Sequence, residues 1–272
     1  MKSCITIKAW KRDKYLKQVI DSLNKCIGIE HIPVIIGIDP WKSTKKEMLE
    51  AANSLKCEEL HVFYHKEQLG CAGNTKWCFD QAFELNEFDY MIHLEDDTPV
   101  APDFINWMLW AGNYMNDRMD VFAVCPFTRR ISGQGKGDRS IEGSTLSPHF
   151  DCGGGFGMTK YQWIEIKELG GMFGCVGNCN INLPPDKWKN RGDLIITWKG
   201  SWAWPFNKYF IRGKFCLYPN TNRSNNIGAE DGLFNPNPKW HKDNVLVDRW
   251  CGSSEFKDTD WKSIQYTLPS DG

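Results

Sequence analysis

Three consecutive carboxylates, Glu95, Asp96 and Asp97, are the residues of this sequence best suited to chemistry. They follow directly on residues 90–94, a largely apolar run. Adjacent carboxylates repel one another unless a cation offsets their charge. Oxygen ligands without thiolates suit Mg²⁺ or Mn²⁺, and either ion could neutralise a leaving diphosphate. The same residues could instead cap the N-terminus of a helix in solvent, and spacing alone leaves both interpretations open.

The elements that must position this triplet alternate between strand and helix over residues 1–127. Continuous apolar runs are typical of strands buried on both faces, and apolar residues three or four apart are typical of amphipathic helices. Strands are predicted at residues 5–9, 32–38, 59–64, 89–94 and 121–126, and helices at residues 13–26, 43–55, 73–87 and 101–115. Such alternation predicts an α/β fold with a parallel sheet, in which ligands bind at the carboxyl ends of the strands.

The second half of the sequence is less regular. Residues 128–147 are rich in Gly, Ser and charged side chains, which predicts a long loop that could act as a lid. Beyond it, strands are predicted at residues 150–158 and 215–218, helices at residues 160–168 and 204–211, and no periodic element after residue 235. We expect one domain over residues 1–272, with a nucleotide-binding half at 1–127 and a second-substrate half at 128–272.

Composition argues against nucleic acid or a membrane as the partner. The 33 Lys and Arg balance 34 Asp and Glu to a net charge of -1, so no strong positive field is present. The first residues predict a strand rather than a signal peptide, and no apolar run has the length of a membrane helix. The 11 cysteines show no repeated spacing, so we expect reduced thiols and a cytoplasmic location. Cys175 and Cys179 lack the further ligands of a zinc site.

Tryptophan is the unusual component, with 13 residues in 272. The five before residue 130, and Trp163, are predicted to belong to the core. A second group crowds the later half at Trp188, Trp198, Trp202 and Trp204. Indole faces pack against the C–H faces of sugar rings, so this group could line an acceptor site, although core packing explains it equally.

The acidic triplet also carries a resemblance to a known family. Residues 94–97 (LEDD) and 100–104 (VAPDF) resemble the metal-binding, DXD-type segment of GT-A glycosyltransferases, in particular of the N-acetylglucosaminyltransferase I family. Weaker similarities follow in order over most of residues 1–230, at 9–12, 38–39, 69–76, 150–159 and 213–219. Residues 226–228 (NIG) resemble a segment of bacterial family-two sugar transferases.

The resemblance implies an α/β GT-A fold with a central mixed sheet flanked by helices. It further implies an inverting glycosyltransferase that depends on Mn²⁺ or Mg²⁺. The donor would be a UDP-sugar, such as UDP-N-acetylglucosamine, UDP-xylose or a UDP-hexose, and the acceptor a glycan hydroxyl. An enzyme of bacterial or large-virus origin fits a chain without an evident leader or anchor.

The resemblance also implies roles for particular side chains. Asp97 should ligate the metal ion, with His241 from the C-terminal segment as a second ligand. Asp96 should contact the ribose or the surroundings of the metal, and Glu95 the donor sugar. Asp39 should accept a hydrogen bond from the uracil or the ribose.

The remaining nucleotide contacts come from two loops. Arg12 should face the nucleotide or its phosphates, next to Ala9 in the first loop, and Asn74 and Lys76 should belong to the third. Each assignment has an alternative, because Asp39 could be a turn residue, whereas Arg12 and Lys76 could be solvated charges on helices.

The general base is the weakest part of the resemblance. Inverting transfer needs a group that accepts the proton of the acceptor hydroxyl. Ala203 occupies the position where the family has an Asp, so the base would have to be Asp151, Asp193 or Asp231. A glycan-binding pseudo-transferase is therefore one alternative function. A sugar-nucleotide nucleotidyltransferase is another, although residues 9–12 lack the glycines of its usual first loop.

Overall fold

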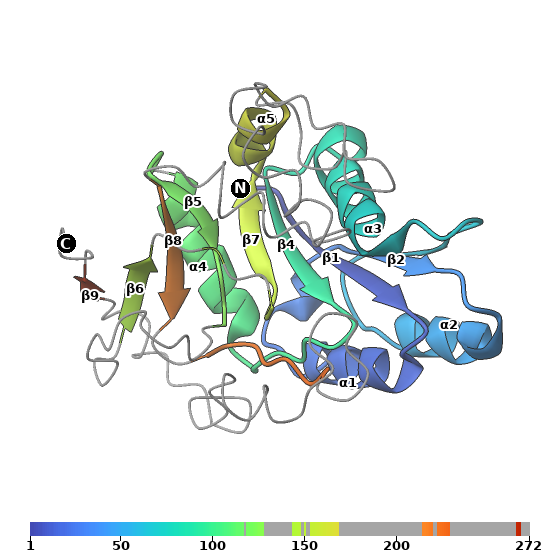
Figure 1. Ribbon diagram of the computed structural model, residues 1–272. Helices are drawn as coiled ribbons and strands as arrows, with labels where there is room; N and C mark the ends of the chain where they lie inside the picture. Colours follow the sequence, from blue (N-terminus) through green and yellow to red (C-terminus); the bar gives the residue numbers. More distant parts are fainter. Residues whose placement is uncertain are drawn as a thin grey trace, which may run out of the picture.

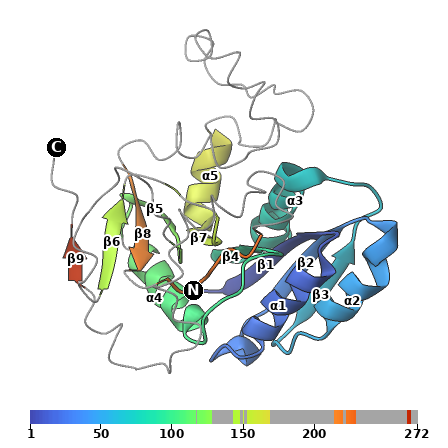
Figure 2. The same cartoon turned by 60° about the horizontal axis from the view of Figure 1, so that its bottom comes forward.

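The computed structural model of the protein describes residues 1–116, 118–127, 143–147, 150, 153–168, 214–219, 222–228 and 265–267 (Figure 1). Over these residues the strands form one nine-stranded mixed sheet in the order β3-β2-β1-β4-β7-β5-β8-β6-β9. Helices lie against both faces of this sheet (Figures 1 and 2). The order is that of an α/β fold, because the first strand lies inside the sheet and later strands are added on both sides of it.

Four strands of the first half run parallel to one another. They are β1 (Ser3–Trp10), β2 (Val34–Asp39), β3 (Leu60–Tyr64) and β4 (Tyr90–Glu95). The helices that follow the first three are α1 (Asp13–Leu23), α2 (Lys45–Asn53, after the short turn η2 at Lys42–Thr44) and α3 (Gly70–Phe79). A turn of 3₁₀-helix, η1 (Ile29–His31), precedes β2. The predicted parallel arrangement of this half is confirmed.

The second half makes the sheet mixed. It contains α4 (Phe104–Asn116), β5 (Val121–Val124), β6 (Gly143–Ser147), β7 (Phe156–Thr159), α5 (Lys160–Glu168), β8 (Phe215–Pro219) and β9 (Gln265–Thr267). Strand β7 is antiparallel to both β4 and β5, and β6 is antiparallel to β8. No described helix is long and apolar enough to cross a membrane.

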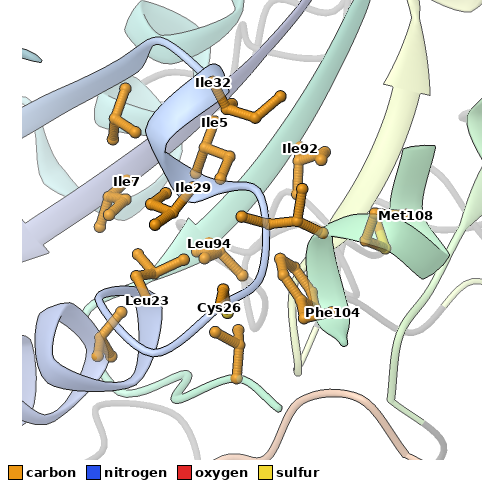
Figure 3. Close-up of a cluster of buried hydrophobic side chains, with 14 of the residues drawn as sticks. Ile5, Ile7, Leu23, Cys26, Ile29, Ile32, Ile92, Leu94, Phe104 and Met108 are labelled. Carbon is orange, nitrogen blue, oxygen red and sulfur yellow. The ribbon is translucent and has the colours of Figure 1, made fainter. Parts of the chain in front are cut away.

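Two apolar cores lie on opposite faces of the sheet because successive side chains of a strand point to opposite sides. One core joins β1 and β4 to α1, α2 and α4, and Figure 3 shows Ile5, Ile7, Ile92, Leu94 and Phe104 in it. The other core joins the opposite face of the same strands to α3 and α5. Strands β1 and β4 are therefore covered on both sides, which fixes the position of their carboxyl ends.

Several sequence predictions need correction. The predicted loop over residues 128–147 is wrong at its end, because residues 143–147 form β6 and pair with β8. The tail after residue 235 contains β9, which pairs with β6. Both strands are short and lack apolar alternation, so tertiary pairing rather than local pattern produces them. The strand predicted at 150–158 begins only at Phe156, after a run of three glycines.

The helix predicted at residues 73–87 also differs from the structure. It begins earlier, at Gly70, and changes into a π-helical turn, η3 (Asp80–Leu85). Gly70 has a positive φ of 73°, a backbone conformation that glycine adopts without the steric cost of a side chain. The local apolar pattern did not show this start, because Gly70 and Cys71 add no periodic apolar residue.

Tyr90 on β4 provides a test of the packing. Its side chain is fully buried and its hydroxyl has no hydrogen-bond partner among the described residues. A Cβ at position 157 would overlap this hydroxyl, so Gly157 is the residue that makes room for it. We expect Tyr90→Phe to raise the free energy of unfolding by about 1 kcal/mol, because a buried unsatisfied polar group is removed.

Tyr64→Phe is the matched control for this substitution. The Tyr64 hydroxyl accepts a hydrogen bond of 2.7 Å from the backbone N–H of Trp41, so its removal should lower the free energy of unfolding by about 1 kcal/mol. Urea denaturation of the two variants and the wild type measures both changes. A loss of stability in Tyr90→Phe equal to that in Tyr64→Phe would contradict this account of the core.

Candidate functional site

The acidic triplet lies at the carboxyl end of β4, beside the end of β1. The two strands pair in parallel register, with Lys8 opposite Glu95. The turn that follows β1 contains Lys11, whose φ of 51° is unusual for a residue with a side chain, and Arg12 at the N-terminus of α1. Register and turn together bring the basic side chains of the β1 end to the carboxylates of the β4 end.

Glu95 forms an ion pair with a buried lysine. Lys8 Nζ lies 2.9 Å from Glu95 Oε1 and also donates to Thr75 Oγ1 at 3.0 Å and to Cys71 Sγ at 2.9 Å. Burial alone would lower the pKa of Lys8, but Cys71 and Glu95 outweigh it, so the pKa lies above its usual value and the ammonium stays charged. Sequence reasoning missed Lys8, although a lysine within the apolar run of β1 was a signal.

Asp96 and Asp97 share a single guanidinium. Arg12 donates from Nε and Nη2 to the two oxygens of Asp96, and from Nη1 to Asp97 Oδ2 at 2.8 Å. The backbone N–H of Trp10 also donates to Asp96 Oδ2 at 3.0 Å. Both carboxylates are buried, with exposed fractions of 3% for Asp96 and 5% for Asp97. Burial raises the pKa of each, and Arg12 opposes that shift.

One oxygen of the Asp97 carboxylate is unpaired among the described residues. Its Oδ1 atom is buried and has no hydrogen-bond partner among the described residues. The neighbouring Thr98 hydroxyl is likewise buried and unpartnered there. An unsatisfied carboxylate oxygen costs free energy in the apolar interior, so Oδ1 is the point at which a cation or a donor group would be most favourable.

A late segment, residues 222–228, covers this end of β4. The backbone N–H of Ile227 donates to the Asp97 carbonyl at 2.9 Å, and a Cβ at Gly228 would overlap Asp97 Oδ2. Asn226 Nδ2 donates to the Gly153 carbonyl at 2.8 Å. Arg223, at the other end of the segment, pairs with Asp103 at 3.1 Å in a buried ion pair. Residues 226–228, noted for their resemblance, thus contact the acidic triplet directly.

Two of the predicted nucleotide-binding residues, Asp39 and Asn74, form hydrogen bonds with backbone groups of other elements. Asp39 accepts hydrogen bonds from the backbone N–H groups of Leu69 at 3.1 Å and Gly70 at 2.7 Å, and so caps α3. Burial raises the pKa of Asp39, and these two N–H groups oppose the shift. Asn74 binds the Gly37 carbonyl at 3.0 Å through Nδ2, and its Oδ1 lies 3.2 Å from a ring nitrogen of His65.

The other predicted residues divide into two sets. Ala9 is buried within β1, and Lys76 is exposed on α3 in an ion pair with Asp80. The structure therefore brings together Arg12, Glu95, Asp96 and Asp97 from the predicted site. The predicted catalytic, metal-binding, acceptor-side and zinc-pair residues that lie outside the described residues are Asp151, Asp193, Asp231, His241, Ala203, Cys175, Cys179, Trp188, Trp198, Trp202 and Trp204.

A metal ion at this site would have few protein ligands. Within the described ranges no group of three or more His, Cys, Asp or Glu side chains could hold a metal ion. Mg²⁺ sites in phosphate-transfer enzymes commonly use one or two carboxylates and complete their shell with water and substrate phosphates. The unpartnered Oδ1 of Asp97 fits such a site, because it offers one carboxylate oxygen and leaves the rest to the ligand.

Two tryptophans lie at the same edge of the sheet, at the ends of β1 and β2. The rings of Trp10 and Trp41 meet edge to face with centroids 5.4 Å apart, and Lys11 Nζ lies 4.4 Å from the centroid of the Trp10 ring. Trp41 is 43% exposed, so its predicted core role is wrong, whereas Trp107 and Trp163 are buried as predicted. The indole N–H of Trp10 is buried without a partner in the described part of the chain.

No protein-family model matches the sequence, and no curated protein does so. Solved structures of S. aureus TarS, a GT-A-type protein, resemble the fold. Residues 1–349 of TarS in complex with UDP share 11% identity and a TM-score of 0.50, covering 82% of this chain and 59% of that one. A second structure of TarS 1–349 shares 11% identity and a TM-score of 0.52, covering 85% of this chain and 62% of that one. A structure of TarS shares 12% identity and a TM-score of 0.51, covering 85% of this chain and 38% of that one.

The chain spans less than two thirds of the length of each of these TarS structures. At such low identity the likeness shows the fold, and the predicted GT-A fold with a mixed central sheet is confirmed. It does not extend to the N-acetylglucosaminyltransferase I family in particular.

Asp39 can be tested as a cap. Asp39→Asn keeps the shape of the side chain but places an amide NH₂ against one of the two backbone N–H groups that the carboxylate accepts. We expect the free energy of unfolding to fall by about 1–2 kcal/mol, the usual cost of losing a helix cap. Urea denaturation measures it, with Asp21→Asn on the exposed face of α1 as the control. A variant as stable as the wild type would show that Asp39 does not serve as a cap.

Proposed function

We propose that this protein is a divalent-metal-dependent inverting glycosyltransferase that uses a UDP-sugar donor and a glycan hydroxyl as acceptor. One observation carries the proposal: the buried carboxylate of Asp97, whose Oδ1 atom has no partner among the described residues, lies at the carboxyl end of β4 in a GT-A fold. Ligands of open α/β sheets bind at these strand ends. One of the structures of similar fold, TarS 1–349, was crystallised in complex with UDP, which supports a uridine diphosphate donor.

Asp97 would hold Mn²⁺ or Mg²⁺, with Asp96 next to it and His241 as a further ligand from the C-terminal segment. When bound, the ion would supply Lewis-acid stabilisation of the leaving diphosphate. Asp97 is suited to this role because its Oδ1 atom has no hydrogen-bond partner among the described residues, whereas Arg12 donates to its Oδ2 atom at 2.8 Å.

The ends of β1 and β2 would receive the nucleoside. The exposed indole of Trp41 offers a flat apolar face, and the buried indole N–H of Trp10 has no acceptor among the described residues. A nucleobase stacks on indole and carries carbonyl acceptors, so both groups suit it. Lys11, in contact with the Trp10 ring, would add positive charge near the phosphates. Asp39, which caps α3, would act here by fixing the loop that begins at Leu69.

The sugar and the acceptor would meet beyond Glu95. Glu95 is held by Lys8, and its side chain remains 22% exposed, so it can contact the donor sugar. The acceptor oxygen would attack the anomeric carbon as the bond to the diphosphate oxygen breaks on the opposite side. Its proton would pass to Asp151, Asp193 or Asp231. The tryptophans at 188–204 would bind the acceptor glycan. The donor sugar is N-acetylglucosamine, xylose or a hexose.

Calorimetric titration of UDP tests the metal site. We expect the wild type to bind UDP at least about tenfold more tightly with Mn²⁺ than without it, because the ion shields the phosphate charge. Asp97→Asn, which keeps the shape and removes the charge, should bind UDP equally with and without Mn²⁺. Asp21→Asn, at an exposed ion pair on α1, should retain the full metal effect. If the UDP affinity of Asp97→Asn depended on Mn²⁺ as much as that of the wild type, the assignment of Asp97 as a metal ligand would be wrong.

Turnover separates an enzyme from a glycan-binding protein. We expect slow Mn²⁺-dependent hydrolysis of at least one UDP-sugar, because water can replace the acceptor in a transferase site. Release of UDP from UDP-N-acetylglucosamine, UDP-xylose, UDP-glucose and UDP-galactose can be followed by a coupled assay. Glycan binding without release of UDP from any donor would instead favour a pseudo-transferase.

A further inference from the structure

The carboxylates at the end of β4 outnumber the cations that contact them. Among the described residues, Glu95, Asp96 and Asp97 form ion pairs only with Lys8 and Arg12. Lys8 serves Glu95, which leaves Arg12 as the counter-ion of both aspartates. One guanidinium therefore offsets two buried carboxylates, and a net negative charge remains where burial makes it costly.

Arg12 does not hold the two aspartates equally. Asp96 receives two donors of the guanidinium and, in addition, the backbone N–H of Trp10. Among the described residues, Asp97 Oδ2 receives only the Nη1 donor and Asp97 Oδ1 has no partner. The bond between Arg12 and Asp97 is thus the one that can be lost while the guanidinium stays anchored on Asp96.

We propose that Arg12 is a partner-switching counter-ion, which gives up Asp97 and takes a diphosphate oxygen of the donor when Asp97 accepts a divalent cation. This inference rests on the function proposed above. In the nucleotide-free protein Arg12 supplies the positive charge that Asp97 needs. Once a cation supplies that charge, two positive groups compete for one carboxylate, and the released Nη1 donor is free for an anion.

The site around Arg12 suits this exchange. Its side chain is only 16% exposed, so a phosphate in contact with it would be largely shielded from solvent, where charge-assisted hydrogen bonds are strong. The guanidinium also lies over the ring of Tyr15, with 5.6 Å between its central carbon and the ring centroid, which holds its plane without engaging a donor. Arg12 can therefore exchange Asp97 for a phosphate oxygen while its guanidinium stays in place on Asp96.

The switch makes Arg12 useful to the nucleotide only when the metal is present. UDP affinity should therefore be measured for the wild type and Arg12→Gln, each with and without saturating Mn²⁺. With Mn²⁺ the variant should bind UDP about tenfold more weakly, the scale of one charge-assisted hydrogen bond. Without Mn²⁺ the two proteins should differ by less than about twofold, because Arg12 is then bound to Asp97.

Titration of Mn²⁺ alone gives a second readout that involves no nucleotide. Arg12→Gln should bind Mn²⁺ about tenfold more tightly than the wild type, since no guanidinium competes for Asp97. Arg12→Lys keeps the charge but cannot span both carboxylates, so it should tighten Mn²⁺ binding by a smaller factor, about threefold. Lys17→Gln on the exposed face of α1 is the matched control and should leave both affinities unchanged.

Each outcome decides the matter. Equal losses of UDP affinity with and without Mn²⁺ would show simple attraction between Arg12 and the nucleotide and overturn the switch. Weaker or unchanged Mn²⁺ binding in Arg12→Gln would also overturn it, and Arg12→Lys answers the same question if the Gln variant does not fold. A wild type whose UDP affinity does not depend on Mn²⁺ would instead overturn the proposed function, and the switch with it.

Discussion

The arrangement of this site depends on three adjacent carboxylates, two of them buried, that pair with two basic side chains. Burial disfavours their charge, and three groups offset this cost: the ammonium of Lys8, the guanidinium of Arg12 and the backbone N–H of Trp10. One oxygen of Asp97 is left over among the described residues. This shortage of positive charge among the described residues is the reason for proposing Asp97 as the ligand of a cation.

The fold keeps this costly arrangement in place. Strands β1 and β4 are adjacent, parallel and covered on both faces, so Lys8 and Glu95 cannot separate. The late segment at 222–228 adds a third support, because its backbone bonds to Pro99, Ala101 and the carbonyl of Asp97. The buried pair of Arg223 and Asp103 anchors that segment. Residues more than a hundred positions apart thereby share the task of orienting Asp97.

The sequence was sufficient for the framework and for the acidic half of the site. The strands and helices of residues 1–127 follow from apolar runs and spacing, and Asp97 at the end of a buried strand follows from the same pattern. The exposure of Trp41 and the existence of β6 could not be predicted from this pattern. A tryptophan beside a strand end is apolar whether it faces a core or solvent, and a short polar strand is recognised only when its partner is known.

By itself the sequence identified the residues suited to chemistry, because three adjacent carboxylates after an apolar strand predict either a cation site or a helix cap, and the resemblance to GT-A glycosyltransferases favours the first. Only the tertiary structure decided how each polar side chain is used. Asp39 and Asn74 bind backbone groups of other elements, whereas Lys8, hidden in an apolar strand, meets Glu95. The physical reason is that hydrogen bonds and ion pairs act over a few ångströms in space, and sequence distance carries no information about that separation.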